Sequence, residues 1–358
     1  MNFYKEFTEE LINQMYKSKK YNCTNMHRPR LSTRGKILCI YEKINTFLNV
    51  LFRFFTKSLI TRDKIDVIVV NRENYFLNNL SNFEKTFLSL SDEESQKKFI
   101  HYLAFRFIGS FSSRLDFHWD EFKQNMKIVD SKRKNNIIHV NEFNYPVNIL
   151  CDEVSSDGMV ILFIDEQYAY NKDIVGVSEN DVVIDCGGAN GDTAMYFCAK
   201  GAKDVYIYEF INSSIDKINK HIEVNPTFRT KIHIIQKAVW SISNLRLSYI
   251  DNGNASQVGK ENEYPYPVKT LSIDNLVEAE DIQRVDFIKM DIEGAEVSAL
   301  EGAKKTIQKY KPKLAISVYH KSDDLITIPA LIKQYNPSYK FFFDYYTNTG
   351  AEAVLYAI

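Results

Sequence analysis

A short glycine-rich stretch, residues 181–192, constrains the fold of this chain more than any other part of its sequence. It begins with the apolar run Val182 to Ile184, which is too short for a helix, and continues with Asp185 and three glycines. The glycines are Gly187, Gly188 and Gly191. This order is typical of a buried strand that turns sharply into a helix. Glycines in such a turn let backbone N–H groups approach a ligand, and a helix starting near Asp192 adds further donors. The stretch therefore predicts a site for a nucleotide-like ligand.

A second carboxylate follows at the end of the next expected strand. Residues 204–210 (DVYIYEF) have a strand pattern and place Glu209 near its end. A carboxylate there can accept hydrogen bonds from both hydroxyls of a ribose. The glycine spacing, Gly-Gly-x-x-Gly, differs from the Gly-x-Gly-x-x-Gly of dinucleotide-binding folds. A glycine-rich loop alone is also compatible with an ordinary turn, but together with Glu209 it indicates a nucleoside site.

The composition is that of a globular protein with room for about two domains, since the chain has 358 residues, 45% of them hydrophobic. Its five cysteines are scattered and contain no Cys-x-x-Cys pair, which argues against a disulfide framework and against a zinc site. The sequence shows neither an apolar signal region nor an uncharged run of about twenty residues. We therefore expect a cytoplasmic protein without a membrane span.

The N-terminal segment, residues 1–64, is basic. It holds thirteen Lys/Arg against five Asp/Glu, although the net charge of the whole chain is −1. Such a segment can meet anionic lipid, nucleic acid or another subunit, or it can simply be solvated. Apolar residues recur at helical spacing between Ile37 and Ile60, which predicts an amphipathic helix. That helix could lie at a membrane surface, or it could pack on its own domain or on a partner subunit.

We expect two domains to follow this segment. Residues 65–150 carry two Ser-x-x-Glu capping boxes, at Ser81 and Ser91, which predict helix starts in a helical N-terminal domain. Gly109 can end the second helix. The charged run 130–136 is the best candidate for a linker to the second domain, residues 151–358.

Strands and helices alternate in this second domain. A doubly wound, mostly parallel sheet with one antiparallel strand near an edge is therefore expected. The expected strands lie at 182–184, 204–210, 231–240, 285–291 and 314–319, and a terminal hairpin joins 340–346 to 353–358. Ligands of such sheets bind beyond the carboxyl ends of the strands. The residues expected there are Asp185, Glu209, Ala238, Asp291 and His320.

Several of these segments together resemble the FkbM family of S-adenosylmethionine-dependent methyltransferases. They are VVIDCGGANGDTA, Glu209, KAVW, VDFIKMDIEGAEVSALEGA and KPKLAISVYH. The resemblance covers about Tyr168 to Ile358, and Asp-Ile-Glu-Gly-Ala-Glu at 291–296 is its most specific part. The region around LSDEESQKKF also looks like the N-terminal extension of bacterial members linked to polysaccharide or lipid-sugar gene sets.

The resemblance implies a class I methyltransferase fold and methyl transfer from S-adenosyl-L-methionine, commonly to a hydroxyl. It implies that the glycine motif wraps the methionine part of the cofactor, that Glu209 holds the ribose and that Ala238 borders the adenine. Asp291 would lie beside the transferring methyl. The cofactor-binding residues implied are Tyr168, Asp185, Gly187, Gly188, Asn190, Gly191, Asp192, Glu209, Ala238 and Asp291. Many members have a proline directly after the ribose-binding glutamate, where this chain has Phe210.

The expected catalytic residues are His320 and Asp291. A hydroxyl is a poor nucleophile until its proton is removed, and a histidine with an ordinary pKa near 6.5 suits that task. Asp291 would orient the acceptor or complement the sulfonium. Both residues also have a purely structural explanation: His320 as a polar residue at a strand end, and Asp291 as a carboxylate at a helix N-terminus. A divalent cation held by Asp291, Glu293 and His320 is a further alternative, whereas no dedicated metal site is predicted.

Three functions follow from these features. The first is an O-methyltransferase acting on a hydroxyl of a sugar or lipid-linked saccharide. The second is a nicotinamide-dependent oxidoreductase, against which the glycine spacing counts. The third is a scaffold that keeps the fold without catalysis. Tyrosines between Tyr249 and Tyr266 offer flat faces for a sugar ring, and nucleic acid is not expected as substrate because the basic excess lies in the N-terminal segment.

Overall fold

The computed structural model describes residues 1–20, 74–108, 115–171, 174–252 and 256–358. They divide into two compact units, residues 1–117 with 347–351, and residues 118–346 with 352–358. The amphipathic helix expected between Ile37 and Ile60, most of the basic segment 1–64 and the helix end expected at Gly109 lie outside the described residues.

The first unit is helical. Its described helices are α1 (Phe3–Lys20), α4 (Leu80–Ser89) and α5 (Glu93–Ile108), which pack against one another. Aromatic side chains fill the space between them, and Phe3 of α1 stacks on Phe7 and contacts Phe87 of α4. Helices are present near both expected starts, but neither predicted cap is. Helix α4 begins at Leu80, so Ser81 lies inside it. Helix α5 is capped by Asp92, whose carboxylate accepts a hydrogen bond from the N–H of Ser95 at 2.7 Å.

The second unit begins at His118, so residues 118–150 belong to it and not to the helical unit. Helix α6 (Trp119–Ser131) packs against α7 (Ser156–Met159) and the π-helical turn η3 (Val160–Ile164). The charged run 130–136 does not behave as a linker, because it forms the end of α6 and a hairpin turn. This hairpin starts a three-stranded antiparallel sheet of β1 (Arg133–Lys134), β2 (Ile137–His139) and β3 (Asn148–Leu150).

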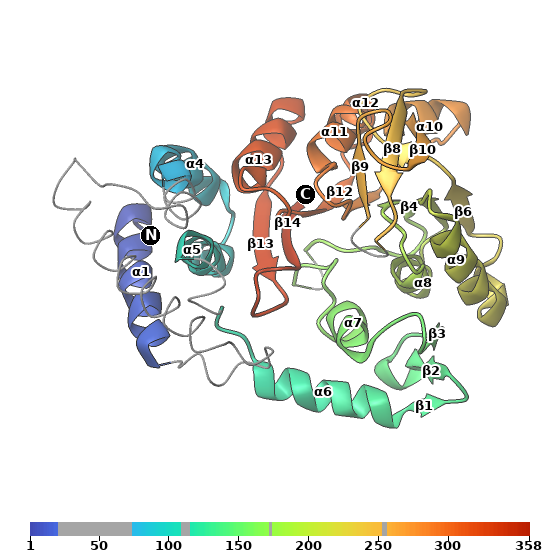
Figure 1. Cartoon of the computed structure of the whole chain (residues 1–358), viewed down its shortest axis with the longest axis horizontal. Helices are drawn as coiled ribbons and strands as arrows, with labels where there is room; N and C mark the ends of the chain where they lie inside the picture. The colour runs from blue at the N-terminus through green and yellow to red at the C-terminus, as the bar shows by residue number, and fades with distance from the viewer. Residues whose placement is uncertain (21–73, 109–114, 172–173, 253–255) are drawn as a thin grey trace. The chain divides into compact units, whose positions relative to one another are not determined.

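A seven-stranded sheet forms the centre of the second unit (Figure 1). Its strand order is β13-β14-β12-β11-β4-β5-β6. The strands are β4 (Val182–Cys186), β5 (Asp204–Tyr208), β6 (Ile232–Ile235), β11 (Phe287–Met290), β12 (Lys313–Ser317), β13 (Phe341–Tyr345) and β14 (Ala353–Ala357). The pairs from β12 to β6 are parallel, whereas β14 is antiparallel to both neighbours. The predicted parallel sheet with one antiparallel strand near an edge is therefore confirmed.

Helices cover this sheet. Helix α8 (Asp192–Ala199) packs on β4 and β5 and against α9 (Asn212–Val224), while α11 (Glu296–Glu301), α12 (Lys304–Tyr310) and α13 (Asp324–Tyr335) form a second group. Every residue of β4 and β11 is buried. Such continuous apolar strands are expected where helices cover both faces of a parallel sheet.

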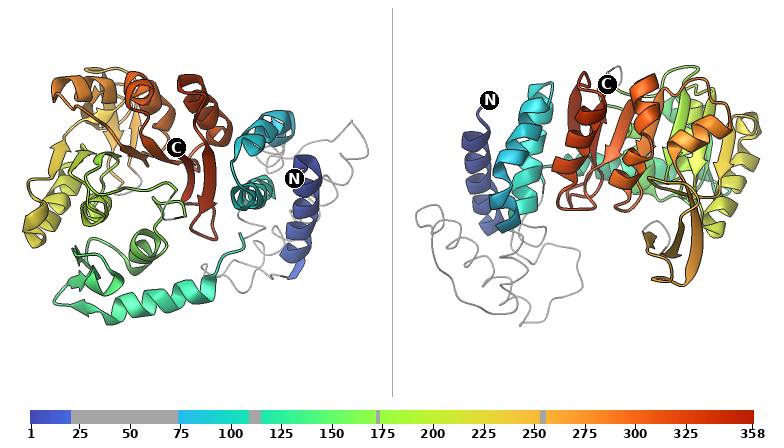
Figure 2. Two further views of the ribbon diagram at one scale, coloured as in Figure 1. Left: turned by 180° about the vertical axis from the view of Figure 1, so that it is seen from behind. Right: turned by 90° about the horizontal axis from the view of Figure 1, so that it is seen from above.

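A second sheet stands apart from the main one, as Figure 2 shows. It contains β7 (Ala238–Val239), β8 (Arg246–Ile250), β9 (Gln257–Gly259) and β10 (Tyr266–Leu271), followed by α10 (Ile273–Ala279). The strand expected at 231–240 is consequently split, because a tight turn from Lys237 N–H to Ile235 C=O separates β6 from β7. Ala238 therefore begins a strand of the second sheet and does not end a strand of the main sheet.

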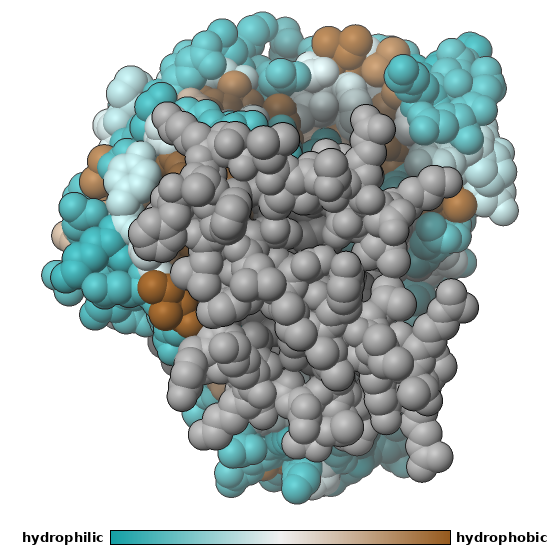
Figure 3. Space-filling model, turned by 60° about the vertical axis from the view of Figure 1, so that its left-hand side comes forward, coloured by the Kyte–Doolittle hydropathy of each residue, from teal (hydrophilic) through white to brown (hydrophobic). Residues whose placement is uncertain are grey.

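Few large hydrophobic side chains are exposed among the described residues. On the face in Figure 3, the described residues that can be seen are mostly hydrophilic. None of the helices in the described ranges combines the length and apolar character needed to cross a membrane.

Candidate active site

An open pocket lies beyond the carboxyl ends of the parallel strands. The register of the sheet explains its position, because Cys186 pairs with both Met290 and Tyr208 at the ends of three adjacent strands. The residues that follow these three strands therefore meet at one edge. The lining includes Gly187, Ala189, Glu209, Ala238, Asp291 and Glu293.

Glycine is required at the first turn after β4. Gly187 has a φ of +91°, and a Cβ atom there would lie 2.1 Å from the backbone oxygen of Asp291. Gly188 has no room for a Cβ either, because the atom would lie 2.1 Å from Ile207 Cγ2. The chain therefore passes close to two neighbouring strands at this point. The glycines are thus required by close packing on the neighbouring strands, and Gly187 lies at the pocket wall.

Glu209 presents a fixed carboxylate to the pocket. Its Oε1 accepts hydrogen bonds from the N–H groups of Phe210 (2.7 Å) and Ile211 (2.8 Å), and its Oε2 accepts one from Ala189 (3.0 Å). Burial raises the pKa of this carboxyl, while the backbone donors lower it. Two carboxylate oxygens offer about four acceptor positions, so one remains for a further donor from a ligand. The contact to Ala189 also ties the glycine loop to the end of β5.

Asp185 lies beneath the glycine loop and outside the pocket lining. It is fully buried, with its Oδ2 accepting from Thr193 Oγ1 at 2.5 Å and its Oδ1 3.1 Å from Lys289 Nζ. The ammonium of Lys289 also donates to the carbonyl of Gly187 at 2.7 Å. Burial lowers the pKa of Lys289 and Asp185 raises it, with a raised pKa as the result. The buried ion pair therefore holds the first turn of the loop from below.

The polar residues of the loop bond away from the pocket. Asn190 donates through Nδ2 to the carbonyl of Glu153 at 2.7 Å and accepts from Lys217 Nζ at 3.1 Å. Asp192 starts helix α8, where its Oδ1 accepts from the N–H of Thr193. Gly191 has a φ of +84° and packs on α9. These three residues shape the loop without lining the pocket.

Asp291 lines the pocket directly after β11, next to the turn at Gly187. Its Oδ2 accepts from Tyr168 Oη and its Oδ1 from Tyr319 Oη, both at 3.1 Å. The imidazole of His320 approaches the same carboxylate, with Nε2 3.5 Å from Oδ1. Tyr168 and the adjacent pair Tyr319 and His320 thus meet at the carboxylate of Asp291. Of these residues, Tyr168, Asp291 and His320 were predicted as site residues.

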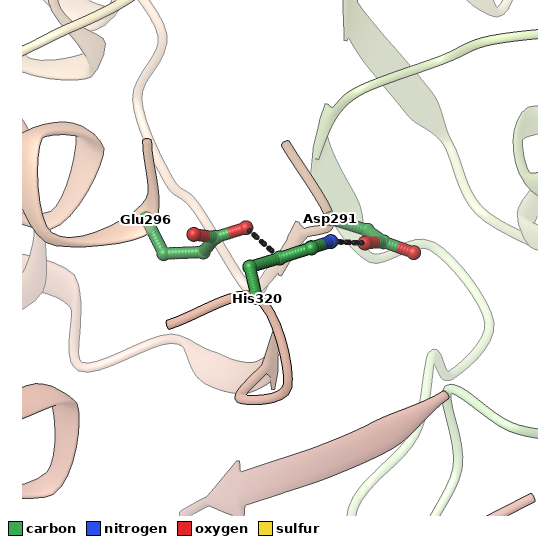
Figure 4. A group of neighbouring side chains, drawn as sticks. All are labelled: Asp291, Glu296 and His320. Carbon is green, nitrogen blue, oxygen red and sulfur yellow. Dashed lines mark ion pairs between the residues drawn. The ribbon is translucent and has the colours of Figure 1, made fainter. Parts of the chain in front are cut away.

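His320 is surrounded by carboxylates, as Figure 4 shows for two of them. Its Nδ1 lies 2.8 Å from Glu296 Oε1, and its Nε2 lies 3.7 Å from Glu293 Oε2. Glu296 is itself buried and accepts the N–H groups of Ile292 and Gly294. The turn between β11 and α11 therefore delivers carboxylates to two sides of one imidazole.

Residues 185–339 match the family model described as the methyltransferase FkbM domain. This region is an FkbM methyltransferase domain. The resemblance predicted from the sequence is confirmed on the segments that carried it, since the matched range contains the glycine loop, Glu209, the 291–296 motif and His320.

One solved structure supports the fold of the FkbM domain. The methyltransferase FkbM of Methylobacillus flagellatus KT is similar with a TM-score of 0.54 and 18% identity, over 80% of this chain and 60% of that chain. This chain thus matches only 60% of the length of that relative. An rRNA methylase from Streptococcus thermophilus (TM-score 0.33, 12% identity, 51% and 87% covered) and fibrillarin from Aeropyrum pernix (0.31, 13%, 51% and 67%) are more distant. No curated protein matches the chain. The predicted class I methyltransferase fold is confirmed.

The charge state of His320 in the FkbM domain differs from the ordinary histidine assumed from the sequence. Burial lowers the pKa of the imidazole, but Glu296, Asp291 and Glu293 raise it to about 9. The ring is therefore an imidazolium at neutral pH in the absence of a ligand. A protonated ring cannot accept a proton, so any role as a base requires that a ligand first change the charge around it.

Sequence reasoning missed two functional neighbours in the FkbM domain. Lys289 was hidden as one letter of an apolar strand, although a lysine inside such a run already signals a buried partner. Glu296 was quoted within the 291–296 motif but given no role. Among the expected aromatic residues, Tyr249 packs edge-on against Phe210 of the pocket wall and in a tilted arrangement against Tyr266.

Proposed function

We propose that this protein is an S-adenosyl-L-methionine-dependent O-methyltransferase that methylates a hydroxyl of a sugar or of a lipid-linked saccharide. One observation carries the proposal most directly: the pocket of an FkbM domain places the fixed carboxylate of Glu209 and the tyrosine-held carboxylate of Asp291 in one cavity. The first carboxylate suits ribose hydroxyls, and the second faces the region where a cationic methyl donor and an acceptor would meet.

The pocket residues fit the cofactor. Glu209 keeps one acceptor position free while three backbone donors fix its orientation, which suits a ribose diol. Ala238 and Val239 offer a small apolar wall for an adenine, and Gly187 forms part of the pocket wall. When bound, S-adenosyl-L-methionine supplies an electrophilic methyl group on a sulfonium. We assign Asp185, Gly188, Gly191, Asn190 and Asp192 to the support of the loop, and Tyr168 to the positioning of Asp291.

The pair Asp291 and His320 would act at the acceptor. In-line displacement depends on alignment of the acceptor oxygen, and Asp291 is suited to orient a hydroxyl because two tyrosine hydroxyls fix both of its oxygens. His320 would tune the charge of that carboxylate or relay the proton of the hydroxyl. If Asp291 and His320 act on the acceptor, substitution of either residue should lower the turnover number more than it lowers the affinity for the cofactor.

A saccharide acceptor is supported by the chemistry of the cavity. Carboxylates and tyrosines are the side chains that accept and donate to several hydroxyls, and Phe210 with Tyr249 and Tyr266 provides flat apolar faces nearby. Phosphate-rich nucleic acid would meet Asp291 and Glu293 at the pocket and is disfavoured. We place the reaction in the cytoplasm, where the free thiols of Cys186 and Cys198 would stay reduced.

The test is a calorimetric titration of the purified protein with S-adenosylhomocysteine and, separately, with NAD. We expect micromolar binding of S-adenosylhomocysteine, a loss of at least tenfold in Glu209→Ala, and unchanged binding in Glu278→Ala, whose carboxylate is exposed on α10. Binding of NAD in place of S-adenosylhomocysteine would favour an oxidoreductase. Absence of both from a folded protein would favour the scaffold that retains the fold without chemistry.

A further inference from the structure

His320 has an unused nitrogen in a buried position. Its side chain is 8% exposed, and within the described part of the chain neither ring nitrogen makes a hydrogen bond of normal geometry, although Nδ1 lies 2.8 Å from Glu296 Oε1. Asp291 Oδ1 and Glu293 Oε2 lie 3.5 and 3.7 Å from this atom, which is longer than the usual 2.7–3.2 Å of a hydrogen bond. A buried polar nitrogen without a hydrogen bond is costly. The arrangement therefore leaves a gap at Nε2 that is lined by carboxylate oxygens.

The separations around this gap fit a metal ion. Neighbouring ligand atoms of an octahedral divalent ion with bonds near 2.1 Å are about 3 Å apart, and Nε2 lies 3.5 Å from Asp291 Oδ1 and 3.7 Å from Glu293 Oε2. Ligand atoms of Asp291, Glu296 and His320 lie within 4.8 Å of one another. An imidazole nitrogen beside carboxylate oxygens is a mixed ligand set that divalent metals accept.

Glu296 has the position of a supporting residue. It meets the other ring nitrogen, Nδ1, at 2.8 Å, and its own Oε1 is held by the N–H groups of Ile292 and Gly294. Metal-binding histidines commonly give their second nitrogen to a carboxylate that fixes the ring. This contact orients the ring so that Nε2 faces Asp291, as seen in Figure 4. Glu296 thus lies beside Nδ1, while Nε2 has no hydrogen-bond partner among the described residues.

The charge of the cluster also favours a cation. Three carboxylates, Asp291, Glu293 and Glu296, surround a single imidazole. Such a group keeps a net negative charge even when the ring is protonated, and a divalent ion would neutralise it. Asp291 and Glu293 line the pocket, so the remaining coordination positions would face the space assigned to the acceptor.

We propose that His320 Nε2, Asp291 and Glu293 form a binding site for one divalent cation, of the Mn²⁺ or Mg²⁺ class, oriented by Glu296 and open toward the acceptor end of the pocket. The inference deepens the proposed function. The role of the ion depends on that function, because the ion would bind the oxygen of the acceptor. The binding site itself is a property of the folded chain and can be measured without cofactor or acceptor.

The experiment measures binding of Mn²⁺ to the purified full chain at pH 7.5, by electron paramagnetic resonance of the free ion and by calorimetry. We expect one ion per chain, competition by Mg²⁺, and at least tenfold weaker binding in Asp291→Asn and Glu293→Gln. Glu301→Gln, an exposed carboxylate at the end of α11, is the matched control and should bind as the wild type does. His320→Ala should also weaken Mn²⁺ binding, but it removes a buried side chain and could unfold the protein. Glu293→Gln lies on the pocket wall and keeps the test valid if His320→Ala does not fold.

Each outcome decides the proposal. Folded wild-type protein that leaves millimolar Mn²⁺ free, or binding that Glu293→Gln and Asp291→Asn leave unchanged, would overturn the site. A parallel titration with S-adenosylhomocysteine in the absence of metal separates the two proposals: cofactor binding without Mn²⁺ binding rejects the cation site alone. Loss of cofactor binding in Glu209→Ala with Mn²⁺ binding intact would support both sites.

Discussion

At the scale of single residues, the site depends on buried charges that compensate one another. Asp185 is fully buried and Lys289 is 2% exposed, and they face each other at 3.1 Å under the glycine loop. A buried ion pair is not in itself strongly stabilising, but removing one partner leaves an uncompensated charge in the interior. The position of Gly187 thus depends on a lysine that does not line the pocket, because Lys289 Nζ also binds its carbonyl oxygen.

Lys289→Met should lower the free energy of unfolding by about 3–5 kcal/mol, because it strands the carboxylate of Asp185. The double variant Asp185→Asn/Lys289→Met should recover part of that loss, since no charge is then left unpaired. Urea unfolding followed by circular dichroism measures both, with Lys269→Met, an exposed lysine of β10, as control. A double variant whose loss equals the sum of the single losses would contradict the coupling.

The residue scale also shows where sequence reasoning ended. Glu209 and Asp291 were predictable because each directly follows a short apolar strand, so parallel register alone brings them together. The partners of Lys289 and Glu296 were not predictable, because the pairs join positions 104 and 24 residues apart. The raised pKa of His320 has the same cause, since three carboxylates from a separate segment determine it.

At the scale of elements, local sequence patterns predicted the strands of the parallel sheet, whereas the connections between elements are determined by turns that these patterns did not predict. The strands of the parallel sheet were found where apolar runs ended in carboxylates or glycines. The strand at 231–240 was predicted as one element but breaks after Ile235, because one tight turn redirects the chain into the second sheet. The unit boundary near Phe117 was also missed, because α6 is mostly polar and is held by its packing on α7 and η3.

Helix α13 provides a test of electrostatics at its first residue, Asp324. Burial raises the pKa of this carboxyl to about 6, although a hydrogen bond from the N–H of Lys321 lowers it. The folded state therefore binds this proton more tightly than the unfolded state does. Its contribution favours folding below the folded pKa and is lost as pH rises through about 6. Between pH 8 and pH 5 the wild type should gain about 1 kcal/mol from this group.

Asp324→Asn should lack that gain. The amide keeps an oxygen to accept from Lys321 N–H, so the variant should fold, and the stability difference between the two proteins should change by about 1 kcal/mol from pH 8 to pH 5. Urea unfolding of both proteins at the two pH values, without added metal, measures the difference. A difference that stays constant with pH would show that this carboxyl titrates normally.

At the scale of the whole molecule, the terminal hairpin is shared between the compact units. Its strands β13 and β14 belong to the sheet, whereas its loop, residues 347–351, belongs to the helical unit. Tyr102 Oη donates to the carbonyl of Gly350 at 2.8 Å, and a Cβ at Gly350 would lie 2.3 Å from a ring carbon of Phe105. The helical unit is therefore built partly from residues near the other end of the chain.

Tyr102→Phe should lower the free energy of unfolding by about 1–2 kcal/mol, because the buried carbonyl of Gly350 loses its donor while the ring keeps its packing. It should also make the loop 347–351 more accessible, which limited proteolysis followed by mass spectrometry detects as earlier cleavage there. Tyr4→Phe is the control, since that ring is 46% exposed. Equal cleavage rates at the loop in both variants would contradict the role of this hydrogen bond.

The place of β14 has a consequence for the order in which the chain is made. Strand β14 follows β13 in the sequence but lies between β12 and β13, and among the described strands β13 pairs with β14 alone. During synthesis the phenylalanine-rich strand β13 therefore emerges before it has a partner, and the exposed edge of β12 stays open until Ala353 to Ala357 leave the ribosome. Domains generally fold as units, and unpaired edges favour aggregation. Nascent chains of this protein should accordingly depend on chaperones until β14 has been made, and a stop codon before β14 should produce insoluble protein.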